Sequence, residues 1–215
     1  MSGGSAVASN RGRSKVRATL LVVDDAPSRQ VPVPVPPGQY EIGPAAGRLR
    51  LRTYRQGLAA KAGHDLVIQA AGWHGRVIVP PEPGAQPSVV VEVDLRRLEV
   101  VEGTGGVKPL TEHDRREIHK AMQKQLRAEE HPVARFSSSS VVVEGDRAVV
   151  AGDLSLGGQV HALQVEVRLA EDGTVAGVAE VLQTSWGIKP YTGFFGALKL
   201  RDAVEVEISV PLGRA

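Results

Sequence analysis

The sequence has no cysteine among its 215 residues, which excludes disulfide bonds and thiolate metal sites. Aromatic residues make up only 4% of the chain, whereas hydrophobic residues reach 42% and are mostly valine, leucine and alanine. No apolar run approaches the roughly 20 residues of a membrane-spanning helix. The early run Ala18–Val23 is also shorter than the roughly 7–15 residue core of a secretory signal. The sequence therefore predicts a cytoplasmic protein that has no membrane span.

The chain also lacks a strong overall charge, because its formal net charge is only +2. Residues 1–35 hold five cations against two carboxylates, a balance of +3, so the remainder of the chain carries −1. The five cations are Arg11, Arg13, Lys15, Arg17 and Arg29. A short basic segment without interleaved aromatic residues is typical of a solvated tail, so no nucleic-acid partner is expected.

The beginning of the chain differs in composition from the rest. Met1–Lys15 is rich in glycine, serine and arginine, and Val31–Pro37 alternates valine with proline. Low hydrophobicity disfavours a packed core, and proline cannot donate a hydrogen bond to a strand ladder. We therefore expect residues 1–38 to form a largely disordered, flexible arm with a proline-rich linker, and residues 39–212 to form one domain.

Strictly alternating residues are clearest in Arg147–Ala170. Leu163, Val165 and Val167 fall on one side of the second run in this segment, and polar residues alternate with them. Successive side chains of a strand point to opposite faces, so the segment predicts a β-hairpin with one dry face. Gly157-Gly158 supplies the positive φ that a tight hairpin turn needs.

The period changes to that of a helix over Thr111–Glu129, which contains neither glycine nor proline. Apolar residues recur every four positions on one predicted face: Ile118, Met122 and Leu126. Thr111, followed three residues later by Asp114, resembles a helix-capping arrangement. The sequence thus predicts one amphipathic helix between strands.

Six further segments alternate like the hairpin. They are Arg48–Tyr54, Asp65–Val79 with a bend or bulge at Gly72 or Gly75, Val89–Glu102, Ala134–Val143, Thr174–Ile188 and Leu198–Leu212. Together with the hairpin they give about eight strands joined by short links. Such links favour an antiparallel meander, and eight strands can close into a barrel that holds one small ligand. A sandwich fits the alternation nearly as well.

Motifs for catalysis are missing from the sequence. There is no Gly-x-Ser-x-Gly elbow, phosphate loop, dinucleotide fingerprint or zinc-protease helix. His113 and Glu117 lie four apart on the predicted helix, but two ligands do not make a zinc site. We therefore expect a protein that is not an enzyme and has neither a metal nor a cofactor.

Five short motifs follow one another along roughly Gln39–Leu212. They are Tyr40-Glu41-Ile42, Gly63-His64-Asp65-Leu66, the segment from His131 to Ser138 (HPVARFSS), the segment from Val150 to Gly158 (VAGDLSLGG), and Ser185-Trp186-Gly187-Ile188. Their order and spacing resemble the YceI-like family, bacterial lipocalin-like barrels associated with polyisoprenoid binding. This chain departs from the family in lacking its usual secretory signal. The resemblance implies an eight-stranded antiparallel lipocalin-like β-barrel and a lipid-binding, transport function.

The resemblance, combined with the one-sided aliphatic strands, implies an isoprenoid or similar long apolar lipid in the barrel lumen. The expected ligand-binding residues are His64, Leu66, Ile118, Met122, Leu126, Phe136, Leu154, Trp186, Ile188, Phe194 and Phe195. For His64, two contacts stay open: a ligand head group or a buried backbone carbonyl. The predicted helix would be a lid over one mouth of the barrel or an ordinary seal of its end.

A second interpretation is a non-catalytic interaction module with a filled core, which binds a partner through its arm or a strand edge. A homodimer also stays open, whereas an enzyme on the same barrel has no residues to support it. The volume of the lumen distinguishes the carrier interpretation from that of an interaction module with a filled core, because a filled barrel leaves no room for a ligand.

Overall fold

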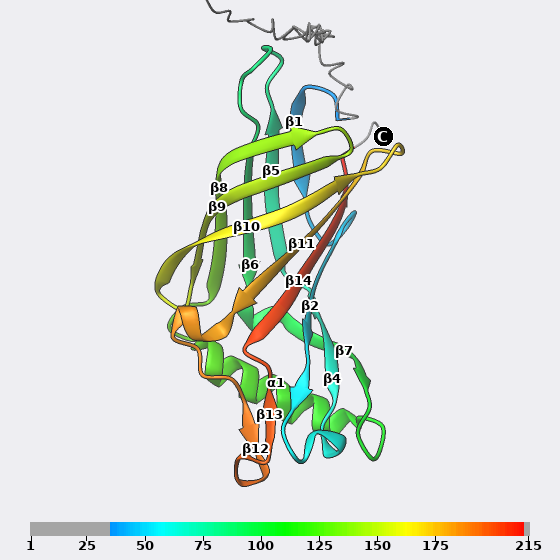
Figure 1. Cartoon of the computed structure of the whole chain (residues 1–215), viewed down its shortest axis with the longest axis vertical. Coiled ribbons are helices and arrows are strands. Elements are labelled where there is room, and N and C mark those ends of the chain that lie inside the picture. Colours follow the sequence, from blue (N-terminus) through cyan, green and yellow to red (C-terminus); the bar gives the residue numbers. More distant parts are fainter. Residues whose placement is uncertain (1–34, 213–215) are drawn as a thin grey trace, which may run out of the picture. The chain divides into compact units, whose positions relative to one another are not determined.

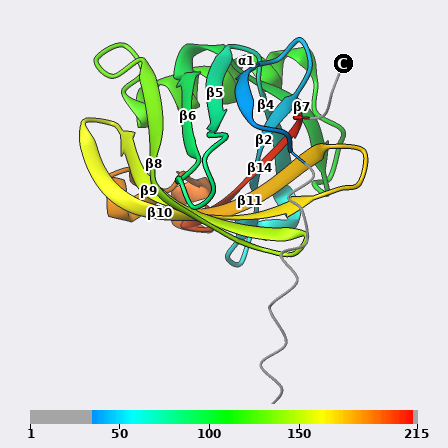
Figure 2. The ribbon, with the colours of Figure 1, turned by 90° about the horizontal axis from the view of Figure 1, so that it is seen from above.

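The computed structural model of the chain describes residues 35–212. Most of the predicted arm, residues 1–34, lies outside the described residues, as do residues 213–215. The described part consists of one large curled antiparallel sheet, a small second sheet and one α-helix (Figure 1). Figure 2 shows the curl from above, with the β8–β11 side opposite the strands next to α1.

The large sheet has eleven strands. In sheet order they are β1 (Gly38–Ile42), β5 (Trp73–Val79), β6 (Ser88–Asp94), β8 (Val133–Glu144), β9 (Arg147–Leu156), β10 (Gln159–Leu169), β11 (Thr174–Leu182), β14 (Ala203–Pro211), β2 (Arg48–Thr53), β4 (Asp65–Ala70) and β7 (Leu98–Thr104). The small sheet contains β12 (Thr192–Gly193), β13 (Leu198–Leu200) and β3 (Arg55–Gln56). The helices are α1 (Glu112–Leu126) and the 3-10 turns η1 (Ala60–Ala62), η2 (Leu95–Arg97), η3 (Gln183–Trp186) and η4 (Phe194–Gly196).

The prediction of a closed eight-stranded barrel is wrong. The sheet is a curled half-barrel of eleven strands, and its two end strands, β1 and β7, are not paired with each other within residues 35–212. The three additional strands arise at three of the links where the chain crosses from one side of the sheet order to the other: residues 43–47, residues 71–72 and η2.

The link at residues 71–72 shows why the predicted Asp65–Val79 strand is two strands. Its backbone leaves the ladder: Ala71 N donates to Arg97 O at 2.8 Å, and Gly72 O accepts from Asp94 N at 2.8 Å. A Cβ on Gly72 would lie 2.6 Å from Cδ of Arg97, so a larger residue here would displace that side chain. β4 and β5 consequently pair with different neighbours.

The hairpin predicted from Arg147–Ala170 is confirmed as β9 and β10. Gly157 and Gly158 form its turn with φ values of 59° and 82°. A bulge at Ser139 interrupts the pairing of β8 with β9. Gly152 lies opposite this bulge, against the ring of Phe136.

Two strands that are distant in the sequence meet where β14 pairs with β2. Glu205 lies opposite Arg52 in this register, and Glu207 lies opposite Arg50. Arg52 Nε donates to Glu207 Oε1 at 2.7 Å, and this bond to the carboxylate raises the pKa of the guanidinium. The arginines of β2 thus face a row of carboxylates on the outer side of the sheet.

The predicted helix is confirmed as α1. Thr111 Oγ1 accepts from Asp114 N at 3.2 Å, and Thr111 N donates to Asp114 Oδ2 at 2.8 Å. The helix ends at Arg127, whose backbone is left-handed with φ 49°. Ile118, Met122 and Leu126 are half-buried and pack against the core. In the described part of the chain, no helix has the length and apolar character needed to cross a membrane.

Candidate ligand-binding cavity

The curled sheet encloses a cavity of about 1090 Å³. All eleven strands of the large sheet contribute side chains to its wall, and so does α1. Sites for small molecules usually measure roughly 300–1,000 Å³. The cavity is therefore large enough for a ligand beyond the usual size of a metabolite.

Aliphatic side chains make up most of the cavity wall, because one face of each alternating strand points inward. On β10 these are Leu163, Val165, Val167 and Leu169, the side predicted to be dry. Leu51, Val206 and Ile208 form the corresponding wall on β2 and β14. The wall is a long apolar surface with few groups that could form hydrogen bonds with a ligand.

Polar side chains of the wall gather near α1. Seven of them come from α1 and from the loops and turns beside it: His64, Lys108, Asp114, Glu117, Gln125, Gln183 and Tyr191. The remaining one is Thr53, the last residue of β2. Strand residues far from α1 contribute only apolar groups, so the cavity is polar at one end and apolar along the rest.

Thr53 and His64 differ in how their polar atoms are satisfied. Thr53 is 8% exposed, and its hydroxyl has no hydrogen-bond partner. The His64 ring hydrogen-bonds through Nε2 to Lys108 O at 2.8 Å, which requires the proton on Nε2. Of the two contacts considered for His64, the structure shows the backbone carbonyl.

Each of the two carboxylates of the wall forms a hydrogen bond with a neighbouring side chain. The Thr111 hydroxyl donates to Asp114 and lowers the pKa of that carboxyl, and the Lys120 ammonium does the same for Glu117. Both side chains are therefore charged at neutral pH. Among the described residues, no group of three or more His, Asp or Glu side chains could hold a metal ion.

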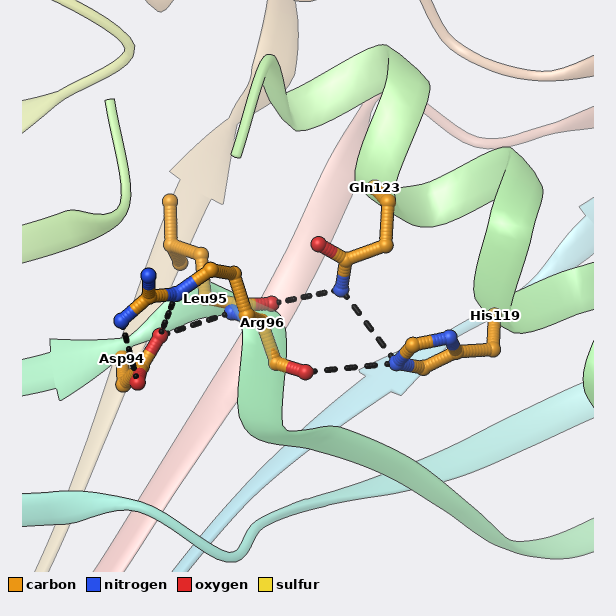
Figure 3. Close-up of polar contacts among 5 residues, drawn as sticks. All are labelled: Asp94, Leu95, Arg96, His119 and Gln123. Atoms are coloured by element: carbon orange, nitrogen blue, oxygen red, sulfur yellow. Dashed lines mark hydrogen bonds and ion pairs between the residues drawn. The ribbon is translucent and has the colours of Figure 1, made fainter. Parts of the chain in front are cut away.

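Helix α1 is fastened to η2 by side-chain hydrogen bonds (Figure 3). Gln123 Nε2 donates to Leu95 O at 2.9 Å, and the His119 ring contacts Arg96 O at 3.3 Å. The Arg96 side chain in turn forms an ion pair with Asp94, in which Arg96 Nε lies 2.9 Å from Asp94 Oδ1. These contacts hold the helix at the point where β6 passes into β7.

Further bonds fasten α1 to other segments. Arg115 donates to Val100 O on β7 at 2.6 Å, and Gln125 donates to Lys189 O at 3.1 Å. The helix thus spans from the β6–β7 side to the segment after η3, and its apolar face covers the polar end of the cavity.

Eight of the predicted ligand-binding residues line the cavity: His64, Leu66, Ile118, Met122, Leu126, Phe136, Leu154 and Ile188. Trp186 does not. It is buried beside the wall, where its Nε1 donates to Leu154 O at 3.0 Å and its ring meets that of His161 edge-on at 5.3 Å. Phe195 is fully exposed on η4, and the side chain of Phe194 lies outside what the structure describes. Ligand contact by the eight remains a prediction.

Sequence reasoning missed part of the site. Alternation along Arg48–Tyr54 places Leu51 and Thr53 on one face of that strand, so a signal for their place in the wall was present. Lys108 gave no such signal, because a loop residue has no period, whereas Gln125 lies seven residues after Ile118 and thus on the same face of the helix. Ser138 and Gly152 do not belong to the wall: Ser138 Oγ accepts from Val89 N on β6 at 2.8 Å, and Gly152 packs against β8 beside Phe136.

Comparisons with known proteins agree with this architecture. A family model described as YceI-like domain matches residues 40–212. Among solved structures, BcnA from Burkholderia cenocepacia matches with 16% identity and a TM-score of 0.58, covering 76% of this chain and 94% of that one. A YCEI protein of Campylobacter jejuni matches with 10% identity and a TM-score of 0.49, covering 66% and 81%. At 16% identity, the likeness to BcnA shows the fold alone. A search of curated proteins found no match.

Proposed function

The chain belongs to the YceI-like family, and from that membership we propose that it is a binding and carrier protein for an isoprenoid or another long apolar lipid. The observation that carries the proposal is the shape and lining of the cavity. It has room for a long chain, and its polar groups lie at one end only. A lipid with a polar head would fit with its tail along the strands and its head beside α1.

The free energy of such binding should depend mainly on the length of the apolar chain of the ligand, and less on specific polar contacts. Each methylene group that moves from water into an apolar cavity contributes about 0.8 kcal/mol. The aliphatic wall can supply this along most of its length, while the few polar groups can orient the head. Thr53 supports this arrangement, because leaving a buried hydroxyl unpaired costs about 1–3 kcal/mol, and an oxygen of a ligand head or a water could pair with it.

The carrier interpretation is favoured over the filled interaction module by the cavity itself, since a packed core would leave no space of about 1090 Å³. The two carboxylates of the wall, Asp114 and Glu117, each bond to a neighbouring side chain, and that the protein is not an enzyme stays a prediction. A cytoplasmic location remains a prediction, which fractionation of the host cell tests directly.

Native mass spectrometry of the full chain, purified from its own host, tests the proposal. We expect a co-purifying mass that solvent extraction releases as a lipid. A bare protein that also takes up no added prenyl alcohol would contradict the carrier function and favour the interaction module.

Two substitutions on one strand sharpen the test. Ala179 on β11 is 6% exposed and lines the cavity, whereas Ala176 lies exposed on the outer face of the same strand. Ala179→Trp should obstruct the cavity with a bulky ring and reduce uptake of a prenyl alcohol, and Ala176→Trp should retain it. Circular dichroism checks that both variants fold. Equal uptake by both would place the ligand outside the cavity.

A further inference from the structure

The mouth of the cavity is marked by the exposed residues in its wall. These are Ala62, Val107, Lys108, Pro109, Glu117 and Tyr191, and all of them belong to α1 or to loops beside it. Every other residue of the wall is buried or half-buried. A ligand that enters or leaves by the accessible end must therefore pass between α1 and these loops.

Three segments form this end of the molecule, and we call them the mouth rim: residues 54–64, 104–110 and 189–201. Hydrogen bonds join them: Ala59 N donates to Ala197 O at 3.0 Å, and the His64 ring bonds to Lys108 O at 2.8 Å. Figure 1 shows the β3–β4 loop, the β12–β13 hairpin and the loop after β7 together at the lower end, next to α1.

Each segment of the mouth rim exposes at least one large apolar side chain. Leu58 is 100% exposed, Val107 is 79% exposed, and Phe195 is fully exposed. Phe195 also has a left-handed backbone with φ 53°, which is a costly conformation for an aromatic residue. Strain of this kind, held at a surface site, is characteristic of functional positions.

The charge of the mouth rim has one sign. Its three segments contain six cations and no carboxylate: Arg55, Lys61, Lys108, Lys189, Lys199 and Arg201. None of the six forms an ion pair with another described residue. The chain beyond residue 35 has a formal charge of only −1, so this concentration of positive charge is local.

We propose that the mouth rim docks on the surface of an anionic lipid bilayer, with Leu58, Val107 and Phe195 inserted among the head groups and the lysines bound to them. Apolar side chains at an interface bury about 5–10 Å into the head-group region, and each nearby cation adds attraction to anionic lipid. Lysine is depleted in protein interfaces, which makes a bilayer the better match than a protein partner. The inference builds on the proposed function, because docking would let the lipid pass into the cavity without crossing water.

Vesicle flotation of the full chain tests the docking. The vesicles contain phosphatidylcholine alone or with about 30% phosphatidylglycerol, to mimic an anionic leaflet. We expect binding to the anionic vesicles, and a fall in partitioning of about tenfold or more for the pair Leu58→Ser and Phe195→Ser. The pair Lys61→Gln and Lys199→Gln should weaken binding to the anionic vesicles only.

Matched controls separate the mouth rim from other surfaces. Val142 and Val160 are exposed apolar residues on the outer faces of β8 and β10, so the pair Val142→Ser and Val160→Ser should bind like the unaltered chain. Replacing the five cations of residues 1–34 by glutamine should also leave binding intact. Binding that survives the mouth-rim substitutions but is lost with the arm substitutions would overturn the proposal.

Two further readouts complete the test. Light scattering during size exclusion reports the oligomeric state: a dimer that the mouth-rim substitutions dissociate, without vesicle binding, would make this surface a self-association interface and overturn the proposal. Uptake of a dispersed prenyl alcohol is measured on the same samples. Docking without uptake contradicts the carrier function alone, and uptake without docking contradicts the docking alone.

Discussion

Gly152 illustrates how single residues set the packing of the large sheet. A Cβ at this position would lie 2.7 Å from Ser138 Cα and 2.8 Å from Phe136 Cζ, and it would also meet Ser137 O. Two of these atoms belong to the backbone of β8 and cannot move without disturbing the bulge at Ser139. The absence of a side chain at Gly152 therefore allows β8 and β9 to stay paired where Phe136 enters the cavity wall.

Substituting Gly152→Ala should consequently destabilise the domain. We expect a loss of about 1–3 kcal/mol in the free energy of unfolding, because overpacking forces the backbone of β8 to shift. Urea denaturation followed by circular dichroism measures it. Ser137→Ala, which alters an exposed side chain next to the same bulge, is the control and should change stability by less than about 0.5 kcal/mol. Equal stability of both variants would contradict the register of β8 on β9.

The direction of individual strand side chains could be predicted from the sequence, whereas residues at turns could not. Leu154 and Leu163 line the cavity as the alternation indicated. Trp186 lies in the 3-10 turn η3 and Phe195 in η4, where the period of two ends. Tertiary packing then decides the outcome: one ring became buried beside the wall and the other became fully exposed.

At the scale of elements, the cap of α1 is predicted to respond to pH. Hydrogen bonds from Thr111 lower the pKa of Asp114, so the folded state favours the carboxylate. The stabilising effect is present above the ordinary carboxyl pKa of about 3.9 and is lost as the pH falls through the lower value in the folded protein. We expect the Thr111 amide resonance to shift in this acidic range in an NMR titration.

Two variants check the assignment of this titration. Asp114→Asn should remove the pH dependence of the Thr111 amide, since the amide side chain does not titrate. Glu112→Gln alters an exposed acid of the same helical turn and should preserve it. A Thr111 amide that titrates unchanged in Asp114→Asn would show that the capping box does not form.

The fastening of α1 to η2 gives a prediction about release of the ligand. Gln123→Ala removes the bond to Leu95 O, which should cost about 1 kcal/mol and speed lipid dissociation about fivefold if α1 must move. Stopped-flow transfer of a fluorescent lipid to vesicles measures the rate. The exposed Lys124→Ala is the control and should leave the rate unchanged. An unchanged rate in Gln123→Ala would mean that the ligand leaves by a path that does not involve α1.

The helix and the hairpin were predictable elements, but the three links were not. Capping residues and the four-residue spacing are local signals, and they located α1 to within a few residues. At Gly72 the glycine indicated a bend, yet the exchange of neighbours between β4 and β5 depends on bonds to Arg97 and Asp94, which lie more than twenty positions away in the sequence. Local patterns do not contain such pairings, so eleven strands were read as eight.

At the scale of the whole molecule, the length of the cavity should set the affinity for a homologous series of ligands. Affinity for primary alcohols should rise about fourfold with each added methylene while the tail lies inside the aliphatic wall. It should level off once the tail fills the cavity. Isothermal titration calorimetry of the series measures this. A rise that continues without a plateau, or no dependence on length, would contradict binding in an enclosed cavity.

The pairing of β14 with β2 has a consequence for the timing of synthesis. Arg52 and Glu207 are 155 positions apart, so β2 emerges from the ribosome long before the strand that completes its ladder exists. Until then β2 can pair only with β4, and the valine-rich inner faces of the growing chain have no enclosure. Non-local strand pairing of this kind slows folding and prolongs the exposure of apolar surface that is prone to aggregate. The same hollow that can shelter a lipid in the finished protein is thus, in the nascent chain, a surface for chaperones to cover.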